Sequence, residues 1–272
     1  MTGNHGVWLH LVARDLDPRQ IVGLTGVGGA PLRAVEAGGL IGVVGTVDLD
    51  EFGEEPLRRN LENLPWLETV ARAHHDVAQA VGRFGPVAPT RLATVYHDDT
   101  RVASVLAQRR TAFTAALDRV AGRTEWGVKA YAAAGTGAAA ARPVPAGGGA
   151  SPGMAYLQRR RAQLSASEAA QRAAVNGADE VHTALERHAE AGRRHKPQDE
   201  RLTGAAGWNV LNGAYLVDAA RAEEFATLVR QLGDAHPGLR LELTGPWPPY
   251  SFAVVEDEVA GGDAAGAGKA WP

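Results

Sequence analysis

Residues 239–255 read LRLELTGPWPPYSFAVV, and this stretch organises the second half of the chain. Leucine occupies every second position at its start, and tyrosine, phenylalanine and valine do so near its end, a pattern typical of strands with one buried face. Between them, three prolines restrict the backbone and remove three amide donors. The stretch therefore predicts two short strands that face each other across a rigid turn carrying Trp247 and Tyr250.

The composition is that of a globular protein without cysteine chemistry. The chain has 272 residues, of which 45% are hydrophobic, a formal net charge of -3 and no cysteine. This length is comfortable for two domains. The slightly acidic balance argues against nucleic-acid binding, and no window approaches the roughly 20 apolar residues of a membrane span. We expect a cytoplasmic protein without a signal peptide, and we predict no cofactor and no metal site.

The predicted fold class is α+β with two small domains. Each is expected to hold an antiparallel or mixed sheet with helices on one face, as variants of the ferredoxin-like fold, with a long alanine-rich helix in addition. The N-terminal domain is predicted at 1–131, and an Ala/Gly/Pro-rich linker at 132–151. The C-terminal domain, which begins with the long helix, is predicted at 152–258. A disordered tail is predicted at 259–272.

Periodicity locates the individual elements. Apolar residues at spacings of three and four predict two helices in the first domain, the first capped by Asn63 and the second opened by Asp98. The acidic residues between 48 and 55 are expected in a solvated turn. Strands are predicted at 7–12, 32–36, 39–47, 86–96, 124–131 and 208–217, and helices around 67–81, 98–120 and 152–190. A polar connection is expected at 193–198, and a further helix capped by Asp218.

Two adjacent histidines, His74 and His75, are the most conspicuous candidates for chemistry. Adjacent positions on a helix diverge by about 100°, so the two rings do not readily share one metal. His74 lies on the apolar face of its helix, which favours a core histidine with a local hydrogen bond. The alternative hypothesis is a ferredoxin-like ligand-binding regulator or a small metal-dependent enzyme that uses His74 or His75.

Two further groups of residues are candidates for contact with a protein partner. Trp247, Pro248 and Tyr250 form either a rigid plug over their own domain or an aromatic anchor, since exposed tryptophan and tyrosine are favoured at interaction hot spots. Arg159 and Arg160 belong to a basic run. That run is either a solvated helix face or a surface for an acidic partner.

Several motifs, taken in order, resemble the gas vesicle GvpL/GvpF family. In the first half, AHHDV at 73–77 and PVAPTRLATVY at 86–96 resemble the helix and following strand of that family. In the second half, AYL at 155–157 with the arginines after it, LNGAYLV at 211–217 and TGPWPPYSF at 244–252 match in the same order. The long linker and the Gly/Ala-rich tail depart from the family pattern.

This resemblance implies an accessory or minor structural protein of the gas vesicle, and not an enzyme. Members are implied to bind the small hydrophobic protein of the vesicle shell, together with other accessory proteins, and to assist assembly. The implied location is the cytoplasm, in association with the gas vesicle.

Overall fold

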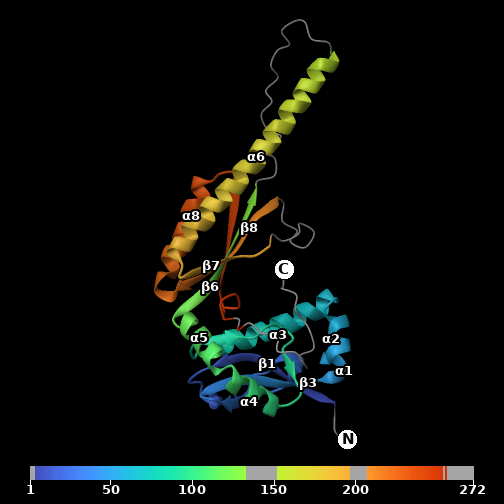
Figure 1. Cartoon of the computed structure of the whole chain (residues 1–272), viewed down its shortest axis with the longest axis vertical. Coiled ribbons are helices and arrows are strands. Elements are labelled where there is room, and N and C mark those ends of the chain that lie inside the picture. The colour runs from blue at the N-terminus through green and yellow to red at the C-terminus, as the bar shows by residue number, and fades with distance from the viewer. Residues whose placement is uncertain (1–3, 133–151, 197–206, 254, 256–272) are drawn as a thin grey trace. The chain divides into compact units, whose positions relative to one another are not determined.

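The chain forms two compact units, seen in the computed structural model of Figure 1. The structure describes residues 4–132, 152–196, 207–253 and 255. Unit 1 contains the described residues up to 125 and those from 246 onward, and unit 2 contains those from 126 to 245. The chain enters unit 2 within strand β6 (Arg123–Ala132) and leaves it within strand β9 (Leu239–Trp247).

This division differs from the boundary predicted at the alanine-rich linker. The predicted C-terminal domain at 152–258 shares residues with both units, because residues from 246 onward belong to unit 1. The reason is that β6 and β9 are neighbours in one sheet, so entry and exit of unit 2 lie side by side. Nearly all of the predicted linker, 133–151, and all of the predicted tail, 259–272, lie outside the described residues.

The sheet of unit 1 is built around β1, in which every residue from Trp8 to Val12 is at most 1% exposed. The strand order is β2-β3-β1-β4, β5 also pairs with β1, and the pairs are antiparallel. An unbroken apolar run is what a strand covered on both faces requires. The strands are β1 (His5–Ala13), β2 (Leu32–Ala37), β3 (Leu40–Asp48), β4 (Val87–Pro89) and β5 (Val95–Tyr96).

Helices pack against both faces of this sheet. The apolar face of α3 lies in a buried cluster with Val43 of β3, whereas Val102 and Leu106 of α4 lie against the neighbouring Gly42. Successive residues of a strand point to opposite faces, so the two helices cover opposite sides. The helices of unit 1 are α1 (Leu49–Phe52), α2 (Glu54–Asn60), α3 (Leu64–Gly82), α4 (Asp99–Gln108) and α5 (Arg110–Val120), with short 3-10 turns η1 (Pro18–Ile21) and η2 (Val27–Gly29).

Side-chain caps determine where these helices begin. Asn63 caps α3 as predicted, because its side chain accepts a hydrogen bond from the backbone amide of Trp66. Asp48 caps α1 in the same way through the amide of Asp50. The solvated turn predicted between 48 and 55 is therefore wrong. That stretch forms α1 and the start of α2, and it buries Phe52 against β1.

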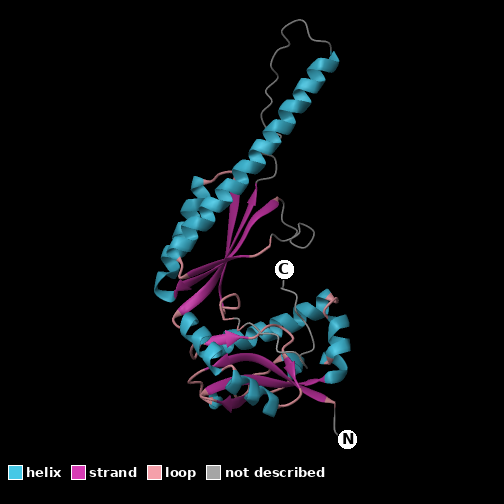
Figure 2. Cartoon of the chain, viewed as in Figure 1, coloured by secondary structure: helices cyan, strands magenta, loops and turns pink. Residues whose placement is uncertain are grey.

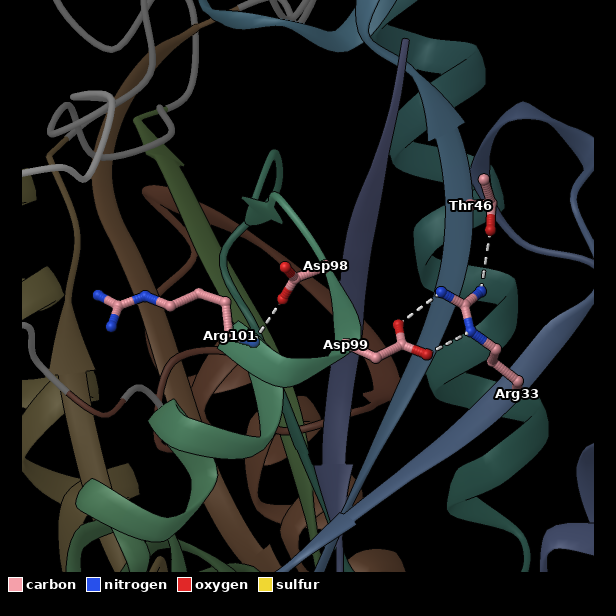
Figure 3. Close-up of polar contacts among 5 residues, drawn as sticks. All are labelled: Arg33, Thr46, Asp98, Asp99 and Arg101. Atoms are coloured by element: carbon pink, nitrogen blue, oxygen red, sulfur yellow. Dashed lines mark hydrogen bonds and ion pairs between the residues drawn. The ribbon is translucent and has the colours of Figure 1, made fainter. Parts of the chain in front are cut away.

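A charged contact fastens α4 to the sheet (Figure 3). Arg33 of β2 donates hydrogen bonds to both carboxylate oxygens of Asp99, at 2.9 and 2.6 Å, and to the Thr46 hydroxyl of β3 at 3.0 Å. The adjacent Asp98 accepts a hydrogen bond from the backbone amide of Arg101 at 2.7 Å and caps the helix. Bidentate pairing sets the orientation of α4, although partial exposure of both side chains limits its contribution to stability.

Unit 2 has the β-α-β-β-α-β order of a ferredoxin-like fold. Its strands lie in the order β7-β8-β6-β9, with β7 antiparallel to β8. Figure 2 shows both of its helices on one face of this sheet. Besides β6 and β9, its elements are α6 (Pro152–His188), β7 (Ala191–Arg194), β8 (Trp208–Asp218) and α8 (Ala222–Ala235), with a 3-10 turn η3 (Ala219–Arg221). The predicted α+β class is confirmed, and unit 2 has the predicted ferredoxin-like order. In unit 1, helices cover both faces of the sheet and not one face as predicted, because α3 and α4 pack on opposite sides of β3.

One buried cluster joins the helices of unit 2 to its sheet. Leu211, Tyr215 and Val217 of β8 belong to this cluster. They lie on the same face of the strand because side chains alternate between the two faces, and Gly213 at the remaining position of that face has no side chain. Tyr215 and Phe225 are completely buried, with ring centroids 5.6 Å apart. From α6 the cluster takes only residues of its C-terminal half: Ala174, Ala178, Val181 and Leu185.

Four predicted elements need correction. The single helix predicted around 98–120 is two helices, α4 and α5, because Arg109 between them has a non-helical backbone (φ -104°, ψ 17°). The strand predicted at 86–96 is interrupted between β4 and β5, because Ala93 adopts a left-handed conformation (φ 66°) that turns the backbone. The polar connection predicted from Arg193 contains part of β7, whose pairing with β8 extends the sheet. The helix expected to start at Asp218 begins at Ala222, after η3, and Asp218 makes no capping hydrogen bond there.

The predicted return strand after Trp247 is also wrong. Residues 248–253 form successive turns, in which the amide of Tyr250 donates to the carbonyl of Pro248 and that of Phe252 donates to Pro249. The two prolines have no amide hydrogen with which to continue a ladder, so β9 ends at Trp247.

Among the described residues, no helix combines the length and the apolar character that crossing a membrane would demand.

Candidate functional site

The C-terminal segment, residues 246–253, is anchored to unit 1 by a buried carboxylate. Glu125 is 8% exposed, and its two oxygens accept hydrogen bonds from the backbone amide of Ser251, at 2.7 Å, and from the Ser251 hydroxyl, at 2.6 Å. The guanidinium of Arg119 donates to the carbonyl of Phe252 at 3.2 Å. Phe252 and Ala253 are each 2% exposed. The segment is thus an integral layer of unit 1.

Removing this carboxylate tests the anchor. In Glu125→Ala, the amide and hydroxyl of Ser251 lose a charged acceptor in a nearly dry setting, so we expect a loss of about 2 to 3 kcal/mol in unfolding free energy. Ser251→Ala removes only the hydroxyl bond and is expected to cost about half as much. Equilibrium chemical denaturation measures both variants. Equal stability of Glu125→Ala and the unmodified protein would contradict the assignment.

Tyr250 is the plug of the C-terminal segment. Its ring packs against the buried cluster that α3 shares with β1 and β3, and it lies 6.1 Å from the ring of His74. Its hydroxyl is buried and has no hydrogen-bond partner among the described residues. Burial is the main cause that raises the pKa of the Tyr250 phenol, and the nearby charges of Glu125 and Asp76 raise it further. The phenol therefore stays neutral. Tyr250 packs as a plug, but over the core of unit 1 and not over the domain predicted at 152–258.

Trp247 differs from Tyr250 because its ring remains 41% exposed. It meets the half-buried His75 of α3 edge to face, with ring centroids 5.4 Å apart. His75 also stacks on Tyr250, at 6.1 Å between centroids. The following Pro248 is partly buried and Pro249 is buried. Trp247 is therefore held against α3 by its neighbours while presenting apolar surface to solvent.

His74 is a core residue with both ring nitrogens occupied. The indole of Trp8 donates to His74 Nδ1 at 3.1 Å, and His74 Nε2 donates to the carbonyl of Thr90 at 3.1 Å. This arrangement requires a neutral ring. The pKa of His74 is lowered to about 4, mainly by burial and to a smaller degree by the nearby His75. The hydrogen bond to Thr90 acts in the opposite direction and raises the pKa. His74 is a core residue as predicted, but its hydrogen bonds are not local, because the partners Trp8 and Thr90 lie 66 and 16 residues away in the sequence.

A second histidine, His10, lies beside His74 in the same core. It is the additional residue of a bulge in β1, since Leu9 pairs with Val44 and Leu11 with the adjacent Val43. The two imidazole rings stack with centroids 5.4 Å apart. Neither nitrogen of His10 has a hydrogen-bond partner among the described residues. Burial, with a smaller effect of His74, lowers the pKa of His10 to about 3.

The His10 environment leaves no room for a further group. A Cβ atom at Gly26 would lie 2.4 Å from His10 Nε2, so only glycine fits there. Gly45 approaches the same nitrogen from β3. Within the described residues, no group of three or more His, Asp or Glu side chains is arranged to hold a metal ion. His74 has no nitrogen lone pair left for a ligand, so these contacts give no support to the alternative hypothesis at His74. They do not test that hypothesis at His75.

The predicted contact residues Arg159 and Arg160 belong to unit 2. Both are exposed, and both lie in the N-terminal half of α6. Trp247, Pro248 and Tyr250 belong to unit 1. The five residues predicted to bind a partner thus fall into two groups on two units.

Three residues of unit 1 were missed by the sequence interpretation. Glu125, Trp8 and His10 all lie within strands, where an isolated polar or aromatic residue carries no periodic signal. For His10, the available signal was a polar residue inside an otherwise apolar run. Glu125 lies in a strand with other polar residues, so no such signal marked it.

Comparison with known proteins identifies the family. Residues 6–254 match the family model described as gas vesicle synthesis protein GvpL/GvpF. The chain belongs to this family. It is 43% identical over 251 residues to gas vesicle protein L of Streptomyces sp. (strain CB03234), covering 92% of this chain and 94% of that protein. To gas vesicle protein F of the same strain it is 27% identical, covering 90% of this chain and 98% of that protein.

Solved structures share the fold of this GvpL/GvpF family protein. The crystal structure of GvpF from Anabaena sp. PCC7120 matches with a TM-score of 0.65 and 17% identity, over 93% of this chain and 98% of that one. The crystal structure of GvpF from Microcystis aeruginosa matches with a TM-score of 0.62 and 16% identity, over 92% and 99%. The family membership predicted from the sequence motifs is confirmed, and with it a role related to gas vesicles.

Proposed function

We propose that this GvpL/GvpF family protein assists gas vesicle assembly in the cytoplasm by binding the small hydrophobic shell protein, with other gas vesicle accessory proteins as additional partners and without catalysis. A subunit that packs into a gas-filled wall must expose apolar surface before assembly, and such surface aggregates. A protein that covers this surface transiently keeps the subunit available. The proposal is supported by membership of a family described by gas vesicle synthesis.

The observation that carries the site assignment is the exposure of Trp247. Its ring is 41% exposed, yet its position is restricted by His75 and by the prolines on both sides. An aromatic residue held in place before binding loses little entropy when a partner covers it, which is the property of a hot-spot residue. We assign Trp247 and Pro248 as the contact to the shell protein, with Tyr250 as the plug that holds them.

Co-purification with the gas vesicle shell protein tests the proposal. Trp247→Ala is expected to weaken binding at least about tenfold, because truncating a hot-spot aromatic residue costs more than about 1.4 kcal/mol of binding free energy. Trp208→Ala is the matched control, since Trp208 is 44% exposed but lies in unit 2. Circular dichroism verifies that both variants fold.

Two outcomes would count against the proposal. If the unmodified protein neither binds the shell protein nor changes its aggregation, direct assistance is refuted. If Trp247→Ala and Trp208→Ala bind equally well, the shell protein does not contact Trp247.

A further inference from the structure

Exposed apolar side chains lie on the N-terminal half of α6, outside the part of the helix that enters the core of unit 2. Leu157 and Leu164 are separated by seven residues, a spacing that returns to nearly the same side of a helix with a drift of about 20°. They are 57% and 51% exposed. The next position at this spacing is the exposed Gln171, and the residues of α6 in the buried cluster begin at Ala174.

The described residues of unit 2 do not cover this half of the helix. Between residues 153 and 166, every residue whose side chain is described is exposed. Figure 1 shows this part of α6, in yellow, extending past α8 and the sheet. Met154 and Tyr156 add further apolar surface, at 54% and 63% exposed. An isolated helix is marginally stable in water, so a projecting one gains most from a partner that buries its apolar side.

The charge of this half of α6 restricts the kind of partner. Residues 152–167 contain three arginines, Arg159, Arg160 and Arg161, and no acidic residue. Arg160 precedes Leu164 by four residues and follows Leu157 by three, so it lies beside both leucines on the helix surface. A partner helix seated on the leucines would therefore place its flanking side chains among guanidinium groups.

A second copy of the same helix does not satisfy this charge pattern. Antiparallel pairing that sets Leu157 opposite Leu164 brings Arg160 opposite Arg161, and parallel pairing aligns each arginine with itself. Like charges at such positions oppose association, whereas acidic residues there favour it.

We propose that the N-terminal half of α6 is a docking surface for an amphipathic helix of another protein, one with an apolar seam and acidic flanking residues. Leu157 and Leu164 receive the seam, and Arg160 and Arg161, which lie on either side of the leucines, pair with the acidic flanks. This inference develops the basic run as the surface for an acidic partner. It does not involve the shell-protein contact at Trp247.

Two synthetic helical peptides of three heptads test this surface on the full-length protein. Both carry leucine at the a and d positions; one has glutamate and the other lysine at e and g. We expect the acidic peptide to bind and the basic peptide not to bind, measured by fluorescence anisotropy. Leu157→Ser with Leu164→Ser is expected to weaken acidic-peptide binding at least about tenfold. The matched control is Val22→Ser with Leu64→Ser, which removes two exposed apolar side chains from unit 1.

Reversing the charge distinguishes recognition from simple hydrophobic contact. Replacing Arg160 and Arg161 together by glutamate is expected to transfer binding from the acidic peptide to the basic one. The proposal is overturned if neither peptide binds, if both bind the unmodified protein equally, or if the serine variant binds as tightly as its control. Dimerisation of the protein through the same leucines, seen by analytical ultracentrifugation, would also overturn it. Because no shell protein is used, these outcomes are independent of the Trp247 experiment.

Discussion

Lowering the pH from 7 to 5 is expected to reduce the stability of unit 1 by roughly 3 to 4 kcal/mol, through His10 and His74. Their folded-state pKa values lie near 3 and 4, below the 6.5 of an unfolded histidine. At pH 5 the unfolded chain therefore binds protons at both sites while the folded chain does not. The stabilisation is fully present above about pH 6.5 and is lost as the pH falls.

Replacing one histidine should make this pH dependence shallower. His10→Phe keeps an aromatic ring in the same space and removes one titrating group, so about half of the pH-dependent loss should disappear. Chemical denaturation between pH 7.5 and 5 measures the effect, and hydrogen exchange of β1 amides reports on unit 1 in particular. An unchanged pH dependence in His10→Phe would show that other groups are responsible.

The second large effect is expected at Tyr250. Tyr250→Ala should reduce the unfolding free energy by about 3 kcal/mol or more, because it opens a cavity beside His74 in the core of unit 1. Trp247→Ala, three residues earlier, should cost about 1 kcal/mol, since much of that ring is already exposed. Thermal and urea unfolding of the two variants make this comparison.

Tyr250→Phe is the sharper control for this site. The Tyr250 hydroxyl is buried without a partner among the described residues, and burying such a group carries a cost. Its removal should leave stability unchanged or raise it by about 1 kcal/mol. A loss above about 1 kcal/mol in Tyr250→Phe would indicate that the hydroxyl has a stabilising partner.

The proposed contact and a stabilising side chain are close together in the C-terminal segment. Trp247 is 41% exposed, whereas Tyr250 is partly buried and packs against the core cluster of unit 1. We therefore expect a double substitution of both to weaken binding for two different reasons. Single substitutions, with stability measured for each, separate a partner contact from the plug that supports it.

Local patterns in the sequence were sufficient for many parts of this protein. The period-2 alternation at 239–243 predicts β9, and spacings of three and four predict α3, because side chains in those elements respond to position along a single segment. Asn63 as a helix cap is equally local. The motifs in 73–77, 211–217 and 244–252 were sufficient to predict the GvpL/GvpF family.

Other features depend on residues that are distant in the chain. The bond between Glu125 and Ser251 joins positions 126 residues apart, and it places the C-terminal segment in unit 1 instead of in a hairpin of unit 2. His10 and His74 meet only because β1 and α3 pack together. Periodicity describes one element at a time and carries no information on which elements become neighbours. The sequence alone therefore determined many of the elements and the family. Tertiary packing decided that Tyr250 is a plug, that Trp247 is exposed, and that Leu157 and Leu164 of α6 lie outside the buried core of unit 2.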